Sequence, residues 1–259
     1  MKNFLKQILK KQFKTLGYNV SKINNETPNQ DFDEILKKYL PKKPVIFDVG
    51  ANQGQSIERF NKIFKDPVIH AFEPIDFEFK NLIKKYSRNK NIILNNFALG
   101  SEDSSQKLNI TAKTGNSSFN KIRTGTEWLK KRSEQYHTSE DGYVLKSQDV
   151  KIKKLDQYSI SNQINKIDLL KIDTQGYEDK VLEGSLKMIK ENNISIVLTE
   201  VIFDNVYNNY LSFSDIEKFL IPENYRMVGI NLSNNNLFSG IAFFADVMYF
   251  NKKIYGDLI

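Results

Sequence analysis

The chain contains no cysteine and only two histidines, His70 and His137. The absence of cysteine excludes disulfide bonds, thiolate nucleophiles and cysteine-based zinc sites. Two histidines are too few for a histidine-rich metal centre. The chain also lacks the run of about 18 apolar residues that a membrane-spanning helix requires, and lysines interrupt the apolar positions of residues 1–20, where a signal peptide would lie. We therefore expect a cytoplasmic protein.

The positive charge is concentrated at the beginning of the chain. The net charge is +7, and residues 1–25 hold six lysines and no acidic residue, so the remainder carries 7 − 6 = +1. A protein that follows nucleic-acid phosphates normally displays a basic groove on its folded body. The nearly neutral body therefore argues against a DNA or RNA partner.

Residues 1–16 have the pattern of a basic amphipathic helix. Its apolar positions recur at helical spacing and its lysines fall on the other side: Phe4, Leu5, Ile8, Leu9, Phe13 and Leu16 against Lys6, Lys10, Lys11 and Lys14. Three alternatives stay open, namely packing on the domain or a second subunit, contact with anionic lipid at the inner face of the membrane, and disorder. Residues 21–30 are polar and predict a linker. We therefore expect an N-terminal arm and linker (1–30) followed by one large domain (31–259).

The most informative segment is residues 45–54, Val-Ile-Phe-Asp-Val-Gly-Ala-Asn-Gln-Gly. An apolar run that fits a buried parallel strand opens into a loop punctuated by Gly50 and Gly54, and a helical pattern begins directly afterwards. The N–H groups at the start of that helix would face an anionic or polar ligand group. Glu73 ends the next apolar run, where its carboxylate can meet a ribose diol.

The loop has two glycines instead of the three that a pyrophosphate-binding loop usually needs. Asp48 lies two residues before the first glycine, where its carboxylate can meet a ligand ammonium or order the loop. These features fit S-adenosylmethionine better than NAD.

From this loop onward the chain resembles the FkbM-type S-adenosylmethionine-dependent methyltransferases. The matching segments are Phe72-Glu73-Pro74, 96–100, 115–119, 167–178 and 245–249. The resemblance implies O-methylation of a hydroxyl, with a saccharide such as a surface-glycan precursor, or another small metabolite, as the acceptor. It implies cofactor binding by the loop, the second strand end and the third strand end, namely Asp48, Gly50, Ala51, Asn52, Gly54, Glu73, Pro74, Asn96 and Ala98.

Alternating strand and helix patterns predict an α/β fold. We expect a class I methyltransferase Rossmann-like fold, whose seven-stranded, mostly parallel sheet ends in an antiparallel C-terminal hairpin. The expected strands are 45–49, 68–72, 91–95, 167–172, 194–200, 225–231 and 242–250, and the expected helices are 33–39, 55–65, 76–86, 177–190 and 213–220. Residues 101–160 interrupt the alternation after the third strand, with expected strands at 107–111 and 144–155 and a helix at 124–135.

The insertion at 101–160 follows a strand whose carboxyl end borders the ligand crevice, so it can form an acceptor pocket or a lid. It carries Trp128 and, among its basic residues, the cluster Lys121, Arg123, Lys130, Lys131 and Arg132. Aromatic and basic groups would suit a sugar bearing phosphate or carboxylate. A solvated charged face explains the same pattern.

Two carboxylates are expected at the ends of the fourth and fifth strands. Asp173 is the first candidate for contacting the acceptor hydroxyl as a base, and Glu200 is the second. Each could instead order a neighbouring loop. Mg²⁺ bound by the same carboxylates stays an alternative, because Mg²⁺ needs few protein ligands. The family often has glutamate where this chain has Gln175, which puts any role of a carboxylate at that position in doubt.

Two other functions remain open at the level of sequence. One is a nicotinamide-dependent oxidoreductase, which the missing third glycine disfavours. The other is a non-catalytic module that keeps the cofactor fold and docks on a membrane or a partner through the basic arm. The intact loop and carboxylates count against the second.

Overall fold

The computed structural model describes residues 31–234 and 242–256. The N-terminal arm, with the helix expected at residues 1–16, lies outside the described residues, and so does the tip of the C-terminal hairpin. Within the described ranges, no helix has the length and apolar composition needed to cross a membrane.

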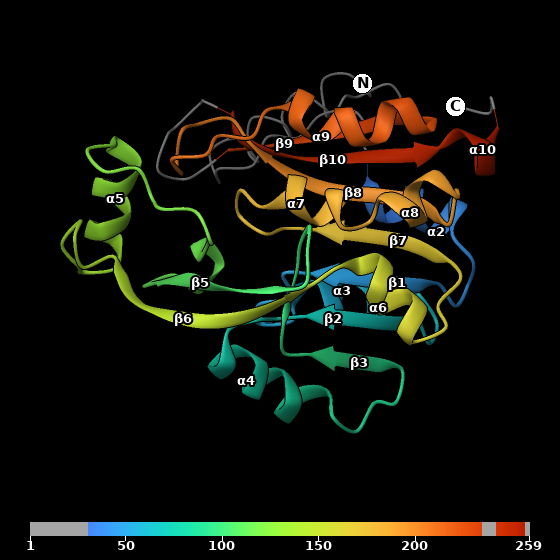
Figure 1. The fold of residues 1–259 in the computed structure, drawn as a ribbon, viewed down its shortest axis with the longest axis horizontal. Helices are drawn as coiled ribbons and strands as arrows, with labels where there is room; N and C mark the ends of the chain where they lie inside the picture. Colours follow the sequence, from blue (N-terminus) through green and yellow to red (C-terminus); the bar gives the residue numbers. More distant parts are fainter. Residues whose placement is uncertain (1–30, 235–241, 257–259) are drawn as a thin grey trace, which may run out of the picture.

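A seven-stranded sheet forms the centre of the fold (Figure 1). From one edge to the other, its strands are β3 (Ile92–Asn95), β2 (Val68–Phe72), β1 (Val45–Val49), β7 (Ile167–Ile172), β8 (Ile194–Ile202), β10 (Ala242–Asn251) and β9 (Tyr225–Asn234). The strands from β3 to β8 are parallel, and β10 runs antiparallel to both β8 and β9. The predicted sheet, with its antiparallel C-terminal hairpin, is confirmed.

Helices cover both faces of this sheet. One face packs on α6 (Leu155–Ser161), α7 (Glu178–Glu183), α8 (Leu186–Lys190) and α9 (Phe213–Leu220), and the other on α2 (Phe32–Tyr39), α3 (Gln55–Ile63) and α4 (Asp76–Tyr86). The short elements η2 (Ile221–Glu223) and α10 (Lys252–Tyr255) flank β9 and β10. Because both faces are covered, the central strands are buried along almost their whole length, which is why they are continuous apolar runs in the sequence.

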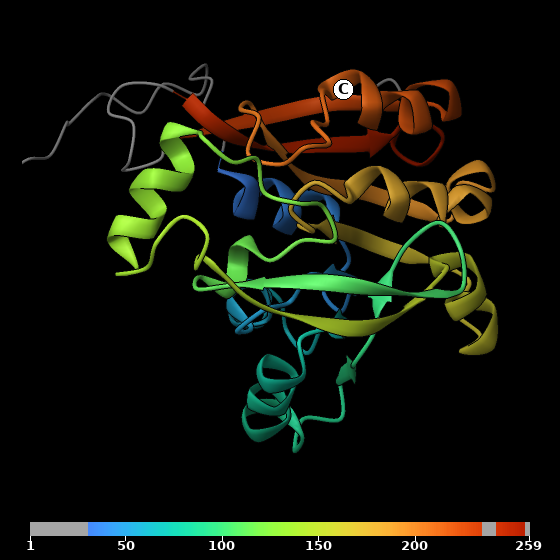
Figure 2. The same ribbon diagram turned by 60° about the vertical axis from the view of Figure 1, so that its left-hand side comes forward.

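The insertion forms a second sheet of three strands. Its strands are β4 (Ala98–Leu99), β6 (Val144–Lys153) and β5 (Ser104–Thr111), and between β5 and β6 lie η1 (Thr114–Asn116) and α5 (Glu127–Gln135). Strands β5 and β6 pair antiparallel as a long ribbon that extends past the carboxyl ends of the parallel strands, with α5 near its far end (Figures 1 and 2). The two extra strands and the helix expected in the insertion are confirmed, although β5 begins at Ser104 and the helix at Glu127, whereas β4 was not predicted.

Two predicted elements differ from the structure. The helix expected at 177–190 is divided into α7 and α8 at Gly184, whose carbonyl accepts a hydrogen bond from the Asp156 backbone N–H (3.0 Å). The Asp156 carboxylate accepts from the backbone N–H groups of Lys187 and Met188 and so caps α8. The strand expected to reach residue 155 ends at Lys153, and the chain enters α6 instead.

Candidate functional site

The loops after β1 and β7 cross at the carboxyl edge of the sheet. The backbone N–H groups of Gly50 and Ala51 donate to the carbonyl of Phe72 (3.1 and 3.0 Å), which fixes the loop after β1. Gly50 has φ +82°, and a Cβ there would lie 1.9 Å from the carbonyl oxygen of Asp173. Glycine is therefore required at this position both by the backbone conformation and by the close approach of the second loop.

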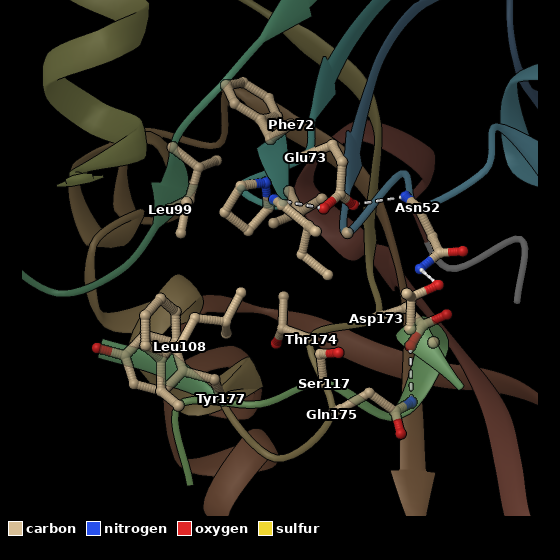
Figure 3. A pocket seen from close by; sticks show the side chains of 18 residues that line it. Asn52, Phe72, Glu73, Leu99, Leu108, Ser117, Asp173, Thr174, Gln175 and Tyr177 are labelled. Carbon is tan, nitrogen blue, oxygen red and sulfur yellow. Dashed lines mark hydrogen bonds between the residues drawn. The ribbon is translucent and has the colours of Figure 1, made fainter. Parts of the chain in front are cut away.

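A first cavity opens beside this crossing (Figure 3). The Glu73 carboxylate lies in its wall, only 3% exposed. It accepts hydrogen bonds from the backbone N–H groups of Asn52 and Ile75, both at 2.7 Å. Burial raises the pKa of Glu73 to about 7, although these two bonds oppose the shift. The end of β2 thus holds one carboxylate in a fixed position in the wall of this cavity.

The rest of this cavity has an apolar side and a polar side. Leu99, Leu108 and Tyr177 lie on one side in Figure 3, and Asn52 and Asp173 lie on the other. The Tyr177 ring packs against Phe119 from the insertion, with ring centroids 4.7 Å apart. A flat apolar group fits the first side, and a polar group fits the second.

A second cavity adjoins the first. The two cavities share Gly50, Asn52, Gly115, Asp173 and Gln175 in their walls. The remaining wall of the second cavity brings together the start of α3, the insertion and the end of β8. Two ligands could therefore meet at Asp173.

Gln175 joins the two predicted catalytic carboxylates. Its Nε2 donates to Asp173 Oδ1 (3.0 Å) and to Glu200 Oε2 (2.7 Å), and its Oε1 lies 3.1 Å from the Tyr207 hydroxyl and 3.4 Å from Asn116 Nδ2. Burial raises the pKa of Glu200 well above its usual range, and the neighbouring Asp173 carboxylate adds to the shift. The amide at 175 thus holds two acidic groups side by side where a third carboxylate would repel both.

Lys171 connects this pair to Asp48. Its buried ammonium lies 3.2 Å from Asp48 Oδ1 and 3.5 Å from Asp173 Oδ2. Burial alone would lower the pKa of Lys171, but the two carboxylates outweigh burial and the net shift is upward. The lysine therefore stays charged and orients Asp173.

Glu178, a residue of the family motif, organises the turn after β7. Its carboxylate accepts from the backbone N–H of Thr174 (2.8 Å), the Thr174 hydroxyl (3.0 Å) and the backbone N–H of Gly176 (3.0 Å). Burial raises the pKa of Glu178 to about 7. Its bonds are all to this turn, so Glu178 supports the site without facing either cavity.

The insertion is fastened to the loop after β1. Asn52 Nδ2 donates to the Thr114 hydroxyl (3.2 Å), which donates to Glu78 Oε1 (2.7 Å). The backbone oxygen of Gln175 accepts from the Ser118 hydroxyl (2.7 Å). These bonds place η1 over the junction of the two cavities.

The predicted site residues fall into three groups. The first cavity is lined by Gly50, Asn52, Glu73, Pro74, Ala98 and Asp173, and the second by Gly50, Ala51, Asn52, Asp173 and Glu200. Three residues line neither cavity: Asp48, Gly54 and Asn96. Asp48 is paired with Lys171, and Gly54 begins α3 at φ +88°.

Asn96, expected at the edge of the adenine, is exposed and lines neither cavity. Its amide donates to the backbone oxygens of Glu73 (3.1 Å) and Pro74 (3.3 Å), so it supports the turn that carries Glu73. The apolar side chains of Leu108 and Tyr177, by contrast, were not predicted as site residues. No local pattern marks them, because they reach the cavity from the insertion and from the turn after β7.

The order of the sheet, the glycine crossing and the carboxylate at the end of β2 define a class I S-adenosylmethionine-dependent methyltransferase fold and site. The family model described as the methyltransferase FkbM domain matches residues 48–227, more than half of the chain, and the chain belongs to this family. It is therefore an S-adenosylmethionine-dependent methyltransferase. This assignment replaces the oxidoreductase and docking-module alternatives.

Several solved structures are similar to the chain. A methyltransferase FkbM from Methylobacillus flagellatus KT has 14% sequence identity and a TM-score of 0.49, and the match covers 81% of this chain but only 44% of that one. A magnesium protoporphyrin IX methyltransferase from Synechocystis PCC 6803, with bound SAM, has 8% identity and a TM-score of 0.46, with 95% and 96% covered. A putative tRNA (m1A22) methyltransferase from Streptococcus pneumoniae has 10% identity and a TM-score of 0.46, with 86% and 70% covered. No curated protein matches the chain.

The described residues contain no group of three or more histidine, aspartate or glutamate side chains arranged to hold a metal ion. Asp173 and Glu200 are bridged by the Gln175 amide. The Gln175 amide nitrogen thus donates to one oxygen of each carboxylate, and the two carboxylates are held by hydrogen bonds to this side chain.

Proposed function

We propose that the enzyme methylates a hydroxyl group of a saccharide or another small metabolite. The observation that carries this proposal is the position of Asp173, in the wall shared by the two cavities and next to Glu200. A carboxylate at such a junction can contact a hydroxyl of one ligand beside a methyl group of the other. The nearly neutral body, with a net charge of +1 outside residues 1–25, favours a small acceptor over a nucleic acid.

The first cavity fits the adenosine part of S-adenosylmethionine. Its apolar side suits the adenine, and the buried Glu73 carboxylate suits a ribose diol, whose two hydroxyls are donors. Gln55 and Ser56, the first residues of α3, lie in the wall of the second cavity. A helix N-terminus favours an anionic group, so this part of the wall suits the carboxylate of the methionyl part of the cofactor. The donor set therefore fits the whole cofactor.

The proposed chemistry is a single displacement. When bound, S-adenosylmethionine supplies a methyl group on a sulfonium sulfur, which keeps the electron pair of the broken S–C bond. Asp173 accepts the hydroxyl proton as the acceptor oxygen forms its new bond to carbon, and the Lys171 ammonium and the Gln175 amide hold the Asp173 carboxylate in place. Alignment across the two cavities supplies the rest of the acceleration.

A saccharide acceptor is supported by the composition of the second cavity. Trp128 and two phenylalanines, Phe243 and Phe244, offer apolar surface, and the polar groups of Asn116 and Glu200 offer hydrogen bonds. Sugar rings combine an apolar face with hydroxyl edges, so this mixture suits them. Turnover should be screened with saccharide acceptors. It should be the same in EDTA as in Mg²⁺, because the proposed proton acceptor is a carboxylate that acts without a metal ion.

Cofactor affinity is predicted to depend on pH through Glu73. A ribose diol donates to the ionised carboxylate, whereas burial gives the unliganded carboxyl a pKa of about 7. Below this pH the carboxyl must lose a proton before it can accept both hydroxyls. The affinity for S-adenosylhomocysteine should therefore fall by up to about tenfold per pH unit below 7 and level off above it, as measured by calorimetric titration between pH 5.5 and 8.5.

Two variants make this titration specific. Glu73→Gln should bind S-adenosylhomocysteine weakly and with a flat pH profile. Glu178→Gln is the matched control, because the pKa of Glu178 is also about 7 but its side chain lines neither cavity. If Glu178→Gln flattened the profile and Glu73→Gln did not, the diol-binding assignment would be wrong. Binding of NAD alone would contradict the proposed function as a whole.

A further inference from the structure

Two basic side chains of the insertion face the second cavity without an acidic partner. Lys113 and Arg132 both line it, and neither forms an ion pair with any residue that the structure describes. Arg132 Nε is buried and has no hydrogen-bond partner. Its Nη1 donates to Gln135 (2.8 Å), and its guanidinium carbon lies 5.9 Å from the Trp128 ring centroid. The buried Nε thus has no acceptor within the part of the chain that the structure describes.

These two cations differ in their ion pairing from Lys171, which also lines the second cavity. Lys171 is neutralised by Asp48 and Asp173. Lys113 is half-buried, and burial and the nearby Arg132 both lower its pKa, against the opposing influence of Glu200 and Asp173. Two cations without an ion pair to a described residue therefore line the same cavity as Asp173 and Glu200. Such an arrangement gains most from an anionic ligand group.

We propose that Lys113 and Arg132 bind an anionic group, a phosphate or a carboxylate, of the acceptor molecule while its hydroxyl lies at Asp173. The inference rests on the proposed function and adds the acceptor's charge to it. From the sequence, a cluster of five basic residues of the insertion was considered as acceptor contacts. Arg132 is the member of that cluster that lines the second cavity. Lys113, the other basic residue proposed here, was not in the cluster.

The same basic pair could in principle bind the carboxylate of the cofactor. The structure favours the acceptor, because both residues belong to the insertion, whereas the cavity wall near the cofactor's expected methionyl end is formed by the start of α3. The test must nevertheless separate these two sources of an anion.

The experiment compares two double variants with the same change in charge. Lys113→Gln/Arg132→Gln removes the basic pair, and Lys107→Gln/Lys130→Gln removes two exposed lysines, on β5 and α5, that line neither cavity. Inorganic phosphate is titrated calorimetrically at low ionic strength into each protein, with and without saturating S-adenosylhomocysteine, and S-adenosylhomocysteine is titrated separately. Thermal unfolding checks that each variant is folded, and the charge-retaining Lys113→Arg/Arg132→Lys is included for the case in which the glutamine variant is not.

Phosphate should bind the wild-type complex and the lysine control, and its affinity should fall about 10- to 100-fold in Lys113→Gln/Arg132→Gln, with S-adenosylhomocysteine affinity retained. The charge-retaining variant should keep most of the phosphate affinity. A parallel loss of S-adenosylhomocysteine affinity, with competition between the two ligands, would assign the pair to the cofactor and overturn the inference. Equal phosphate binding by all variants, or none by the wild type, would also overturn it. Failure of the wild type to bind S-adenosylhomocysteine would instead contradict the proposed function.

Discussion

Replacing Asp173 with asparagine is expected to lower kcat by about 10²- to 10⁴-fold, the usual cost of losing a positioned general base. Asparagine has nearly the same shape, and its Oδ1 can still accept from Gln175 Nε2. Lys171 keeps its ion pair with Asp48. The fold and the cofactor site should therefore persist, and the loss should appear in turnover far more than in S-adenosylhomocysteine affinity.

The comparison with Glu200→Gln identifies which carboxylate is the base. Glu200 is buried and its pKa is raised, so it favours the protonated form beside Asp173. Its replacement by glutamine removes less charge at working pH and should cost less in kcat than Asp173→Asn. Single-turnover rates with the acceptor found in the screen, combined with calorimetry, measure both effects. If Asp173→Asn kept wild-type turnover and Glu200→Gln lost most of it, Glu200 would be the general base instead of Asp173.

The central sheet was predictable because its strands are covered on both faces. The bounds of β1 and β2 agree with prediction to the residue, since each is a short apolar run ended by a polar loop, Gly50 after the first and Glu73-Pro74 after the second. Parallel strands that end in this way must bring their last residues to one edge of the sheet. The meeting of Glu73, Gly50 and Asp173 thus follows from a pattern that a single sequence contains.

The rest of the site depends on contacts that no local pattern records. Lys113 and Arg132 line the same cavity because the chain between β5 and β6, which includes α5, folds over it. Tyr177 lines the first cavity, where its ring packs against Phe119 from the insertion. Asn96 has the expected place in the sequence, but its side chain turns to the backbone of Glu73. Asp173 directly follows β7 as expected, and Glu200 lies within β8. Sequence could not tell which polar side chains point into the cavities.

The role of Gln175 illustrates this boundary. In the sequence it is a departure from the glutamate common in the family, and it suggests only a lost charge. In the structure its amide donates to both Asp173 and Glu200, and it accepts from Tyr207. A neutral residue can hold two acidic groups together, so the substitution changes how the carboxylates are arranged as well as how many there are.

Gly50→Ala is expected to be among the most destabilising single substitutions in this chain. A left-handed backbone costs an alanine about 1–2 kcal/mol, and Gly50 at φ +82° would also place its Cβ 1.9 Å from the Asp173 carbonyl oxygen. The obstacle is backbone, so one of the two crossing loops must move. We expect the free energy of unfolding to fall by about 3–5 kcal/mol, with loss of S-adenosylhomocysteine binding.

Gly125→Ala is the matched control for this substitution. Gly125 also has a positive φ, +70°, but a Cβ there would meet nothing within 4 Å. It should lose only the conformational cost, about 1–2 kcal/mol, and keep its cofactor affinity. Urea unfolding of both variants, with and without S-adenosylhomocysteine, separates strain from collision. Equal losses would show that the close approach of the two loops costs nothing beyond the backbone conformation. The cofactor loop and Asp173 would then be linked by other contacts, such as the hydrogen bond from the Asp173 backbone N–H to the Val49 carbonyl (3.0 Å) and the ion pairs of Lys171.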